Sequence, residues 1–340
     1  MASSSDKAWM KSEDLIYISV ESTISLASVV GNVLVILVVA LNRTLREPTF
    51  CFIVSLAIAD IAVGALVIPL AIVISLGLET PFHTCLFLSC LIVTITQSSI
   101  LSLLAIAIDR YLRVKIPTRY YIVVTQQRAW VAVGVCWLLS FLIGFVPMFG
   151  WHKEIPGNSS NSSLIKCKFT SVISMDYMVY FNFFGWVVVP LIIMAGLYAG
   201  IFHTIHRQLN HRAQASTDSS KYFHKELKLA KSLALVLFLF ALCWLPLHIM
   251  NCVSNFCPTS CIPKTAFYVG IIMSHVNSAL NPMVYAFRIQ RFRDTLIQIG
   301  QRFVLCKRNS LSSCPGDPPA ESPLATANIV TSALPNSNEQ

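Results

Sequence analysis

The sequence has little charge. Only 12% of its 340 residues are Asp, Glu, Lys or Arg, whereas 55% are hydrophobic. A soluble globular domain carries about 25% charged residues, so this chain has too few of them to cover a surface that faces water. The shortage of charge therefore excludes a soluble fold, and the apolar side chains must face lipid.

Other familiar signals are missing as well. The eleven Cys form no CxxC pair, and no His/Cys spacing fits a metal site. The net charge of +9 does not indicate nucleic-acid binding, because no Lys/Arg cluster coincides with aromatic residues or a nucleic-acid motif. Residues 1–14 are polar, so no cleavable signal peptide is predicted and we expect the first spanning helix to direct insertion. Internal repeats are absent, which disfavours a transporter built from two halves.

Seven apolar stretches are long enough to cross a membrane, because about 20 helical residues span a hydrocarbon core of about 30 Å. They are Tyr17–Leu41, Phe50–Leu76, Leu86–Ile108, Ala129–Phe149, Met178–Ile201, Ser232–Val253 and Thr265–Phe287. The sequence therefore predicts an all-α membrane protein in which residues 17–287 form a seven-transmembrane helix bundle.

The basic residues indicate the orientation of this bundle. If residues 1–16 are an extracellular amino terminus, nineteen of the 25 Lys and Arg fall on the cytoplasmic side and six fall outside, in agreement with the positive-inside rule. Two glycosylation sequons, at Asn158 and Asn161, then lie in an outer loop. A third, at Asn42, lies inside, where we expect it to stay unmodified.

The chain changes character after the seventh span. Residues 288–306 alternate basic and apolar side chains at helical spacing, which predicts an amphipathic helix on the inner leaflet of the membrane. Cys306 at its end either carries a palmitoyl chain or remains a free thiol. Residues 307–340 are rich in Ser, Pro, Asn and Ala, which predicts a disordered cytoplasmic tail.

Asp60 is the only acidic residue deep in the predicted bundle, where an ionisable group needs polar partners. The residues predicted to surround it carry hydroxyl or amide oxygens, and they are Ser99, Asn277, Ser278 and Asn281. A carboxylate in such a ring forms either a small-cation site, with sodium as the candidate ion, or a protonated structural Asp that only donates hydrogen bonds. The residues leave both interpretations open.

Five of the predicted spans contain a proline, which lacks an N–H group and favours a kink. These residues are Pro69, Pro147, Pro190, Pro246 and Pro282. Pro246 follows Trp244 and frees the carbonyl of Leu242. A kink beside a bulky aromatic side chain predicts a lever that adopts two angles.

Short motifs at the ends of these spans identify a family. Asp109-Arg110-Tyr111 ends the third span, Cys243-Trp244-Leu245-Pro246 lies in the sixth, and Asn281-Pro282-Met283-Val284-Tyr285 ends the seventh. Asn32 stands in Gly31-Asn32-Val33, and Asp60 ends Leu56-Ala57-Ile58-Ala59-Asp60. With these motifs the chain resembles the rhodopsin-like G-protein-coupled receptors along the whole spanning region.

The resemblance implies a receptor that acts on a heterotrimeric G protein, and not an enzyme. It implies a disulfide between Cys85 and Cys167, which fits an oxidising extracellular location. It also places Arg110 at the G-protein interface, with Asp109 and Glu226 restraining it at rest. The other residues that it assigns to the conformational switch are Tyr111, Pro282 and Tyr285.

The third and seventh spans lack residues that two classes of receptor need. No acid occurs between Cys85 and Asp109, and Ile92 and Val93 occupy the zone where amine receptors carry a carboxylate. The seventh span contains no Lys, which an opsin needs for its Schiff base. With amine receptors and opsins excluded, the interpretation that remains is a receptor for a small, neutral, flat and polar ligand.

Five stretches resemble the inhibitory adenosine receptors nearly residue for residue. They are Phe52–Leu70, Thr96–Arg113, Met175–Phe184, Lys225–Asn251 and His275–Phe287. The resemblance implies adenosine as the ligand, the plasma membrane as the location, and coupling to Gi/o proteins that inhibit adenylyl cyclase. The candidate ligand-binding residues are Glu21, Val93, Thr96, Phe169, Trp244, Leu247, His248, Asn251, Ser274 and His275.

These residue types suit a nucleoside. The Asn251 amide offers a donor and an acceptor in one plane, which matches the edge of adenine. Phe169, placed by the implied disulfide, is predicted to stack on the purine, an interaction worth roughly 1–3 kcal/mol. Ser274 and His275 are predicted to bind ribose hydroxyls, helped by Thr96 and by Glu21, which orients the His275 ring. Each residue taken alone also fits ordinary hydrogen bonding between helices.

Some departures from the family pattern leave the subtype open. Thr170 stands where several family members carry Glu, which weakens or removes a hydrogen bond to the purine amine. Ser274 resembles the third subtype, whereas His248 and the outer loop with a candidate Cys257–Cys261 disulfide resemble the first.

The oligomeric state also stays open, and both homo- and hetero-oligomers fit the sequence. The alternative functions are a receptor for another neutral purine or a lipid and, in another class, an ion channel or transporter.

Overall fold

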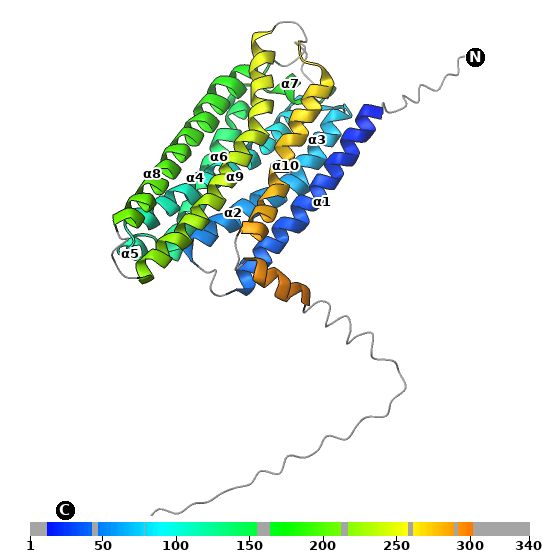
Figure 1. The fold of residues 1–340 in the computed structure, drawn as a ribbon. Coiled ribbons are helices and arrows are strands. Elements are labelled where there is room, and N and C mark those ends of the chain that lie inside the picture. Colours follow the sequence, from blue (N-terminus) through cyan, green and yellow to red (C-terminus); the bar gives the residue numbers. More distant parts are fainter. Residues whose placement is uncertain are drawn as a thin grey trace, which may run out of the picture. The chain divides into compact units, whose positions relative to one another are not determined.

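The computed structural model describes residues 12–42, 47–77, 79–154, 164–211, 217–257, 261–288 and 292–301. Seven long helical segments lie side by side in one bundle, as the sequence predicts (Figure 1). They are α1 (Ser12–Leu41), α2 (Pro48–Ala62) continued by the π-helix η2 (Val63–Val67) and α3 (Ile68–Ser75), α4 (Phe82–Lys115), α6 (Gln126–Gly144), the π-helix η4 (Tyr177–Val188) continued by α8 (Val189–His211), α9 (Thr217–Phe256) and α10 (Lys264–Arg288).

Shorter elements connect these segments. They are β1 (Glu79–Pro81), α5 (Tyr120–Val123), the 3-10 helix η3 (Val146–Phe149), β2 (Leu164–Lys166) and α7 (Phe169–Val172). Residues 292–301 form a further helix, inside the segment 288–306 that the sequence predicts to be an amphipathic helix. Residues 1–11 and 302–340 lie outside the described part of the chain.

Most predicted boundaries differ from the structure, usually because the helix runs beyond the apolar stretch, as in α4 (Phe82–Lys115) and α9 (Thr217–Phe256). The fourth span was predicted to reach Phe149, but α6 ends at Gly144 and the chain continues as η3. Pro147 explains the change, because it lacks the N–H group that would extend the α-helical ladder. At the other end, α1 begins at Ser12, five residues before the predicted span, with Glu13 and Asp14 in its first turn.

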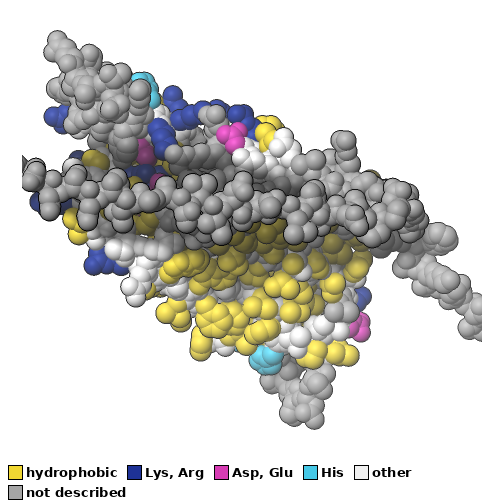
Figure 2. All heavy atoms as spheres, turned by 90° about the horizontal axis from the view of Figure 1, so that it is seen from below, with side chains coloured by type: hydrophobic (Ala, Val, Ile, Leu, Met, Phe, Trp, Pro, Cys, Tyr) yellow, Lys and Arg dark blue, Asp and Glu magenta, His cyan; other side chains and the backbone are white. Residues whose placement is uncertain are grey.

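Six of these segments are long and apolar enough to cross a membrane within the described residues. The seventh, α10, has the length but carries more polar side chains, including His275, Asn277 and Asn281. On the outer surface of the bundle, large apolar side chains such as Leu26, Val131 and Ile192 are more than 60% exposed. Figure 2 shows one side of this apolar surface, which is what lipid contact requires.

The central helix is α4. In the most apolar 18-residue stretch of α4, 67% of the residues are buried, compared with 39% or less in the corresponding stretches of the other five apolar spans. It packs against α2, α6 and α8, whereas α1 packs against α2 and α10. The buried residues of α4 include Asp109, Arg110 and Arg113 near its end, which need partners inside the protein.

Three prolines leave a backbone carbonyl without its helical N–H partner, and a side chain from another segment supplies the missing donor. The Asn32 amide donates to the carbonyl of Ser278, four residues before Pro282, at 2.9 Å. The Gln97 amide donates to the carbonyl of Trp186, four residues before Pro190, at 2.9 Å. The Tyr177 hydroxyl donates to the carbonyl of Ile143, four residues before Pro147, at 2.8 Å. These bonds satisfy carbonyls for which proline provides no N–H donor.

A two-stranded antiparallel sheet and a disulfide hold the loop between η3 and η4 against the bundle. β1 pairs antiparallel with β2, with Thr80 opposite Ile165. The predicted Cys85–Cys167 disulfide is present, with a Cα–Cα distance of 5.6 Å, and both cysteines are buried. The disulfide ties the start of α7 to the beginning of α4.

Candidate functional site

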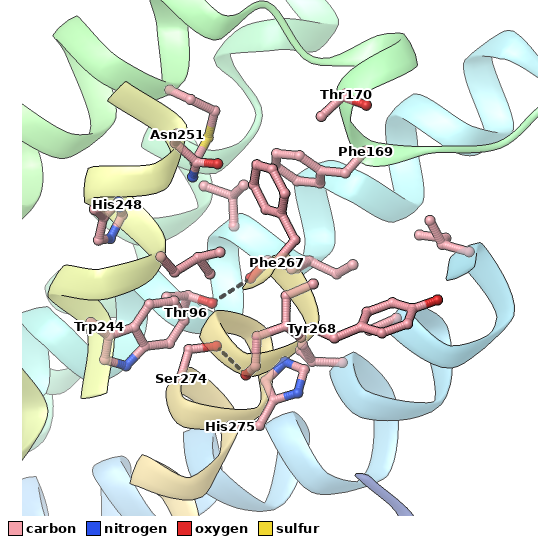
Figure 3. A pocket seen from close by; sticks show the side chains of 18 of the residues that line it. Thr96, Phe169, Thr170, Trp244, His248, Asn251, Phe267, Tyr268, Ser274 and His275 are labelled. Carbon is pink, nitrogen blue, oxygen red and sulfur yellow. Dashed lines mark hydrogen bonds between the residues drawn. The ribbon is translucent and has the colours of Figure 1, made fainter. Parts of the chain in front are cut away.

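A cavity of about 540 Å³ lies among the helices beside α7 (Figure 3). Its walls come from α1, η2, α3, α4, η4, α9 and α10. All but one of the predicted ligand-binding residues line it: Val93, Thr96, Phe169, Trp244, Leu247, His248, Asn251, Ser274 and His275. Glu21 is the exception and contacts His275. The volume is typical of small-ligand sites, which range over roughly 300–1,000 Å³.

α9 presents Trp244, His248 and Asn251 to the cavity because residues three and four positions apart share one helical face. The His248 ring stacks on Phe183, with ring centroids 4.7 Å apart, and is only 4% exposed. Neither His248 ring nitrogen nor the Trp244 indole N–H has a hydrogen-bond partner among the described residues. Buried polar atoms normally find a partner, so these atoms can hydrogen-bond to a polar ligand in the cavity.

Phe169 stands at the first residue of α7, two positions after the disulfide at Cys167. Figure 3 shows its ring at the same end of the cavity as the Asn251 amide, with Thr170 next to it at the edge. The nearby Cys85–Cys167 disulfide restricts where the Phe169 ring can lie. Phe169 therefore lines the cavity close to the disulfide, and its stacking on a purine stays a prediction.

Ser274 and His275 of α10 lie at the opposite end of the cavity (Figure 3). His275 Nδ1 is 2.8 Å from Glu21 Oε2, and Glu21 is fully buried. The Ser274 hydroxyl donates to the Ile271 carbonyl at 2.7 Å, and the Thr96 hydroxyl donates to the Ile92 carbonyl at 2.9 Å. With their protons used on the backbone, these two hydroxyls offer acceptor lone pairs to the cavity.

Asp60 is fully buried in α2. Its Oδ2 accepts a hydrogen bond from the Asn281 amide at 2.7 Å, and Ser278 lies beside it. Its Oδ1 has no partner among the described residues. Ser99 and Asn277 are buried on α4 and α10, the helices that pack against α2. The structure thus brings Asn281 and Ser278 directly to Asp60.

The end of the bundle opposite the cavity is closed by ion pairs around Arg110. Arg110 binds the Asp109 carboxylate at 2.8 Å and lies 3.5 Å from Glu226. Asp109 also accepts hydrogen bonds from Thr49 at 2.6 Å and Tyr120 at 2.7 Å. Burial and the nearby Asp109 carboxylate raise the pKa of Tyr120, so its hydroxyl stays protonated as a donor. Both predicted partners of Arg110, Asp109 and Glu226, therefore lie beside it.

The remaining switch residues lie near this end. Pro282 packs against Gly31 of α1, where an added Cβ would come within 2.9 Å of the proline ring. Tyr285 is buried, and its ring meets Phe292 edge-on at 6.2 Å. Tyr111 lies against Gly200 of α8. Close packing on two glycines shows how tightly these helices approach one another.

The bundle and its motifs match a known family. A family model described as "7 transmembrane receptor (rhodopsin family)" matches residues 31–285. The chain belongs to this receptor family. It is therefore a multi-pass membrane receptor and not an enzyme.

The receptor is also similar to individual curated proteins. Adenosine receptor A3 of Ovis aries is 53% identical over 291 residues, which cover 86% of this chain and 91% of the relative. Adenosine receptor A3 of Canis lupus familiaris is 51% identical over 292 residues, covering 86% and 92%. Adenosine receptor A3 of Bos taurus is 52% identical over 291 residues, covering 86% and 91%. These identities place the receptor among the adenosine receptors, near the A3 subtype, which the sequence motifs had left open.

The structure adds residues to the receptor's cavity that sequence reasoning did not select. The Tyr17 and Tyr268 rings stack with centroids 4.1 Å apart, and both line the cavity. The Asp14 carboxylate accepts from the Tyr268 hydroxyl and pairs with Lys264, each at 2.8 Å. The Asn182 side chain lines the cavity as well. Asp14 and Lys264 are 250 positions apart, so periodicity along the chain gave no signal for their pairing.

Three predicted modification sites cannot be placed, because Asn158, Asn161 and Cys306 lie outside the described residues. The candidate disulfide between Cys257 and Cys261 is present, with Cα atoms 6.4 Å apart. It closes a short loop between α9 and α10, beside the cavity-lining residue Ile262.

Proposed function

We propose that this receptor binds extracellular adenosine, couples to Gi/o proteins and lowers adenylyl cyclase activity at the plasma membrane, with its amino terminus outside. The observation that carries the proposal is that Asn251, Phe169, Ser274 and His275 all line one cavity. The relatives named adenosine receptor A3 support the same ligand.

The two ends of the cavity suit the two parts of a nucleoside. At one end, the Asn251 amide faces the position where an adenine edge would present its exocyclic amine and ring nitrogen. The Phe169 ring beside it offers a stacking surface. At the other end, Ser274, His275 and Thr96 offer polar atoms for ribose hydroxyls. Apolar side chains such as Val93 and Leu247 fill the walls between them.

A competition assay tests the ligand. We expect adenosine to displace a bound radioligand from membranes that carry the receptor. Inosine should compete more weakly, on the order of 5- to 150-fold, because its carbonyl replaces the amine and leaves an Asn251 acceptor unpaired. ATP and a panel of amines serve as comparison ligands. Stronger displacement by inosine or by an amine would contradict the proposed ligand.

Coupling to Gi/o rests on the likeness to the inhibitory adenosine receptors. Lys225, Lys228 and Lys231 lie inside α9, in the half that the proposed orientation places in the cytoplasm, and can attract an acidic partner segment. Charge alone does not separate one G-protein class from another. The likeness therefore supports this part of the proposal, and the charge is only compatible with it.

We expect adenosine to lower forskolin-raised cyclic AMP in cells that express the receptor, and pertussis toxin to abolish this response. The toxin blocks Gi/o proteins, so the effect reports the class of G protein directly. Untransfected cells, with and without toxin, are the control. A cyclic AMP rise that resists the toxin would contradict the coupling and leave the ligand assignment in place.

We further propose that Asp60 holds a sodium ion in the resting state. Sodium prefers oxygen ligands, and Oδ1 of Asp60 is a buried oxygen that finds no hydrogen-bond donor within the described part of the chain. The residues predicted to join it are Ser99, Ser278, Asn277 and Asn281, which carry hydroxyl or amide oxygens, and Asn281 contacts the Asp60 carboxylate directly. The residues present therefore fit the ion.

Raising sodium should lower agonist affinity, on the order of fivefold, because an ion bound to the resting state shifts the population away from the active one. Potassium at equal ionic strength is the control. In Asp60→Asn we expect the sodium effect to disappear, because the amide lacks the negative charge. The same sodium response in the variant would mean that Asp60 is only structural.

A further inference from the structure

Five buried or half-buried charges alternate in sign across the cytoplasmic end of the bundle. In space they form a chain of ion pairs in which each residue contacts the next: Asp109, Arg110, Glu226, Arg113 and Glu47. Arg110 is the member that the family motif singles out. Arg113 lies one turn further along α4, and no motif draws attention to it.

Arg113 makes the closer contact with α9. Its Nε donates to Glu226 Oε1 at 3.1 Å, whereas Arg110 Nη1 is 3.5 Å from Glu226 Oε2. Charge-assisted hydrogen bonds usually measure about 2.7–2.9 Å, so the Arg110 contact with Glu226 is long. Arg110 instead directs both Nε and Nη2 to Asp109 on its own helix. Of the two arginines, Arg113 therefore joins α4 to α9 more directly.

A second carboxylate orients the Arg113 side chain. Arg113 Nη1 donates to Glu47, which immediately precedes α2. The guanidinium also lies 5.4 Å from the centre of the Tyr120 ring in α5. An arginine carries its donors in a rigid planar fork. Fixing Nη1 on Glu47 and one face against Tyr120 thus leaves Nε aimed at Glu226.

We propose that Arg113 holds the resting state by bridging Glu226 to the rest of the bundle, and that Glu47 is the positioning residue for this bridge. Movement of the cytoplasmic end of α9 away from α4 breaks the Arg113–Glu226 contact. The contacts of Arg113 with Glu47 and Tyr120 do not involve α9. The inference rests on the proposed coupling to a Gi/o protein, because that protein reports the state of the receptor.

The decisive variant is Glu47→Gln, because Glu47 touches Arg113 and not Arg110. We expect it to raise nucleotide exchange on added Gi protein without agonist, by about fivefold, and to raise agonist affinity in parallel. The exposed cation Lys115 lies at the same end of α4, so Lys115→Gln is the matched control and should leave basal exchange unchanged. Arg113→Lys keeps the charge but not the fork, and should behave like Glu47→Gln.

The measurements separate this proposal from the proposed function. If the unmodified receptor fails to respond to adenosine, the proposed function fails first. If it responds but Glu47→Gln shows unchanged or lower basal exchange at normal surface expression, the bridging role of Arg113 is overturned. In the double variant Glu47→Gln with Arg113→Lys, effects that simply multiply would also overturn it, because residues acting through one contact are not additive.

Discussion

Asn251→Ala is expected to weaken adenosine binding by about 10- to 150-fold. The change removes a donor and an acceptor together, and each unmatched polar group in a buried site costs roughly 1–3 kcal/mol. Radioligand competition on membranes measures the affinity, and surface labelling measures expression. The methyl side chain keeps the helix intact, so expression should stay near normal.

Asn255→Ala provides the matched control for Asn251. Asn255 lies one turn further along α9, and it is absent from the cavity lining. Its replacement should leave adenosine affinity within about twofold, since it is not in contact with the ligand. Undiminished affinity in Asn251→Ala would remove the proposed adenine contact, while an equal loss in both variants would point to a change in α9 itself.

Phe169→Ala is expected to lower adenosine affinity by about 5- to 150-fold, because stacking of a base on an aromatic ring is worth roughly 1–3 kcal/mol. Phe169→Tyr keeps the aromatic plane and should retain most of the affinity. Phe149→Ala is the control, because Phe149 is 87% exposed and does not line the cavity. The same competition assay compares the three variants.

Two results would argue against stacking at Phe169. Full affinity in Phe169→Ala would show that the ring does not contact the ligand. A loss in Phe169→Tyr as large as that in Phe169→Ala would show that shape near α7, and not the aromatic plane, decides the affinity. Loss of surface expression in either variant would be visible by labelling and is measured separately.

Much of this receptor follows from local features of the sequence. The shortage of charge and the long apolar stretches predict seven spans, because hydrocarbon excludes unpaired charges and unbonded backbone. The spacing of Trp244, His248 and Asn251 predicts one helical face, and the structure places all three in one cavity. The contact between Glu21 and His275 was expected from the resemblance to the adenosine receptors, and the two side chains meet at 2.8 Å.

Other boundaries depended on more than apolar length. The fourth span shows this, because apolar residues continue to Phe149 while the α-helix ends at Gly144. Apolar length predicts how far a segment can lie in the membrane. It does not predict where backbone hydrogen bonding changes from the α to the 3-10 pattern, which Pro147 decides together with the Tyr177 hydroxyl on the Ile143 carbonyl.

Only the tertiary structure decided which distant residues meet. Asn32 satisfies the carbonyl that Pro282 leaves free, although 246 positions separate the bonded residues. Arg113 likewise contacts Glu47 and Glu226, which are 66 and 113 positions away from it in the sequence. Periodicity shows which face of a helix is polar, but the identity of the facing helix depends on packing of the whole bundle. A buried donor or charged group pairs with whichever partner that packing brings within about 3 Å. The sequence alone specifies neither the neighbouring helix nor the register in which the two helices pack.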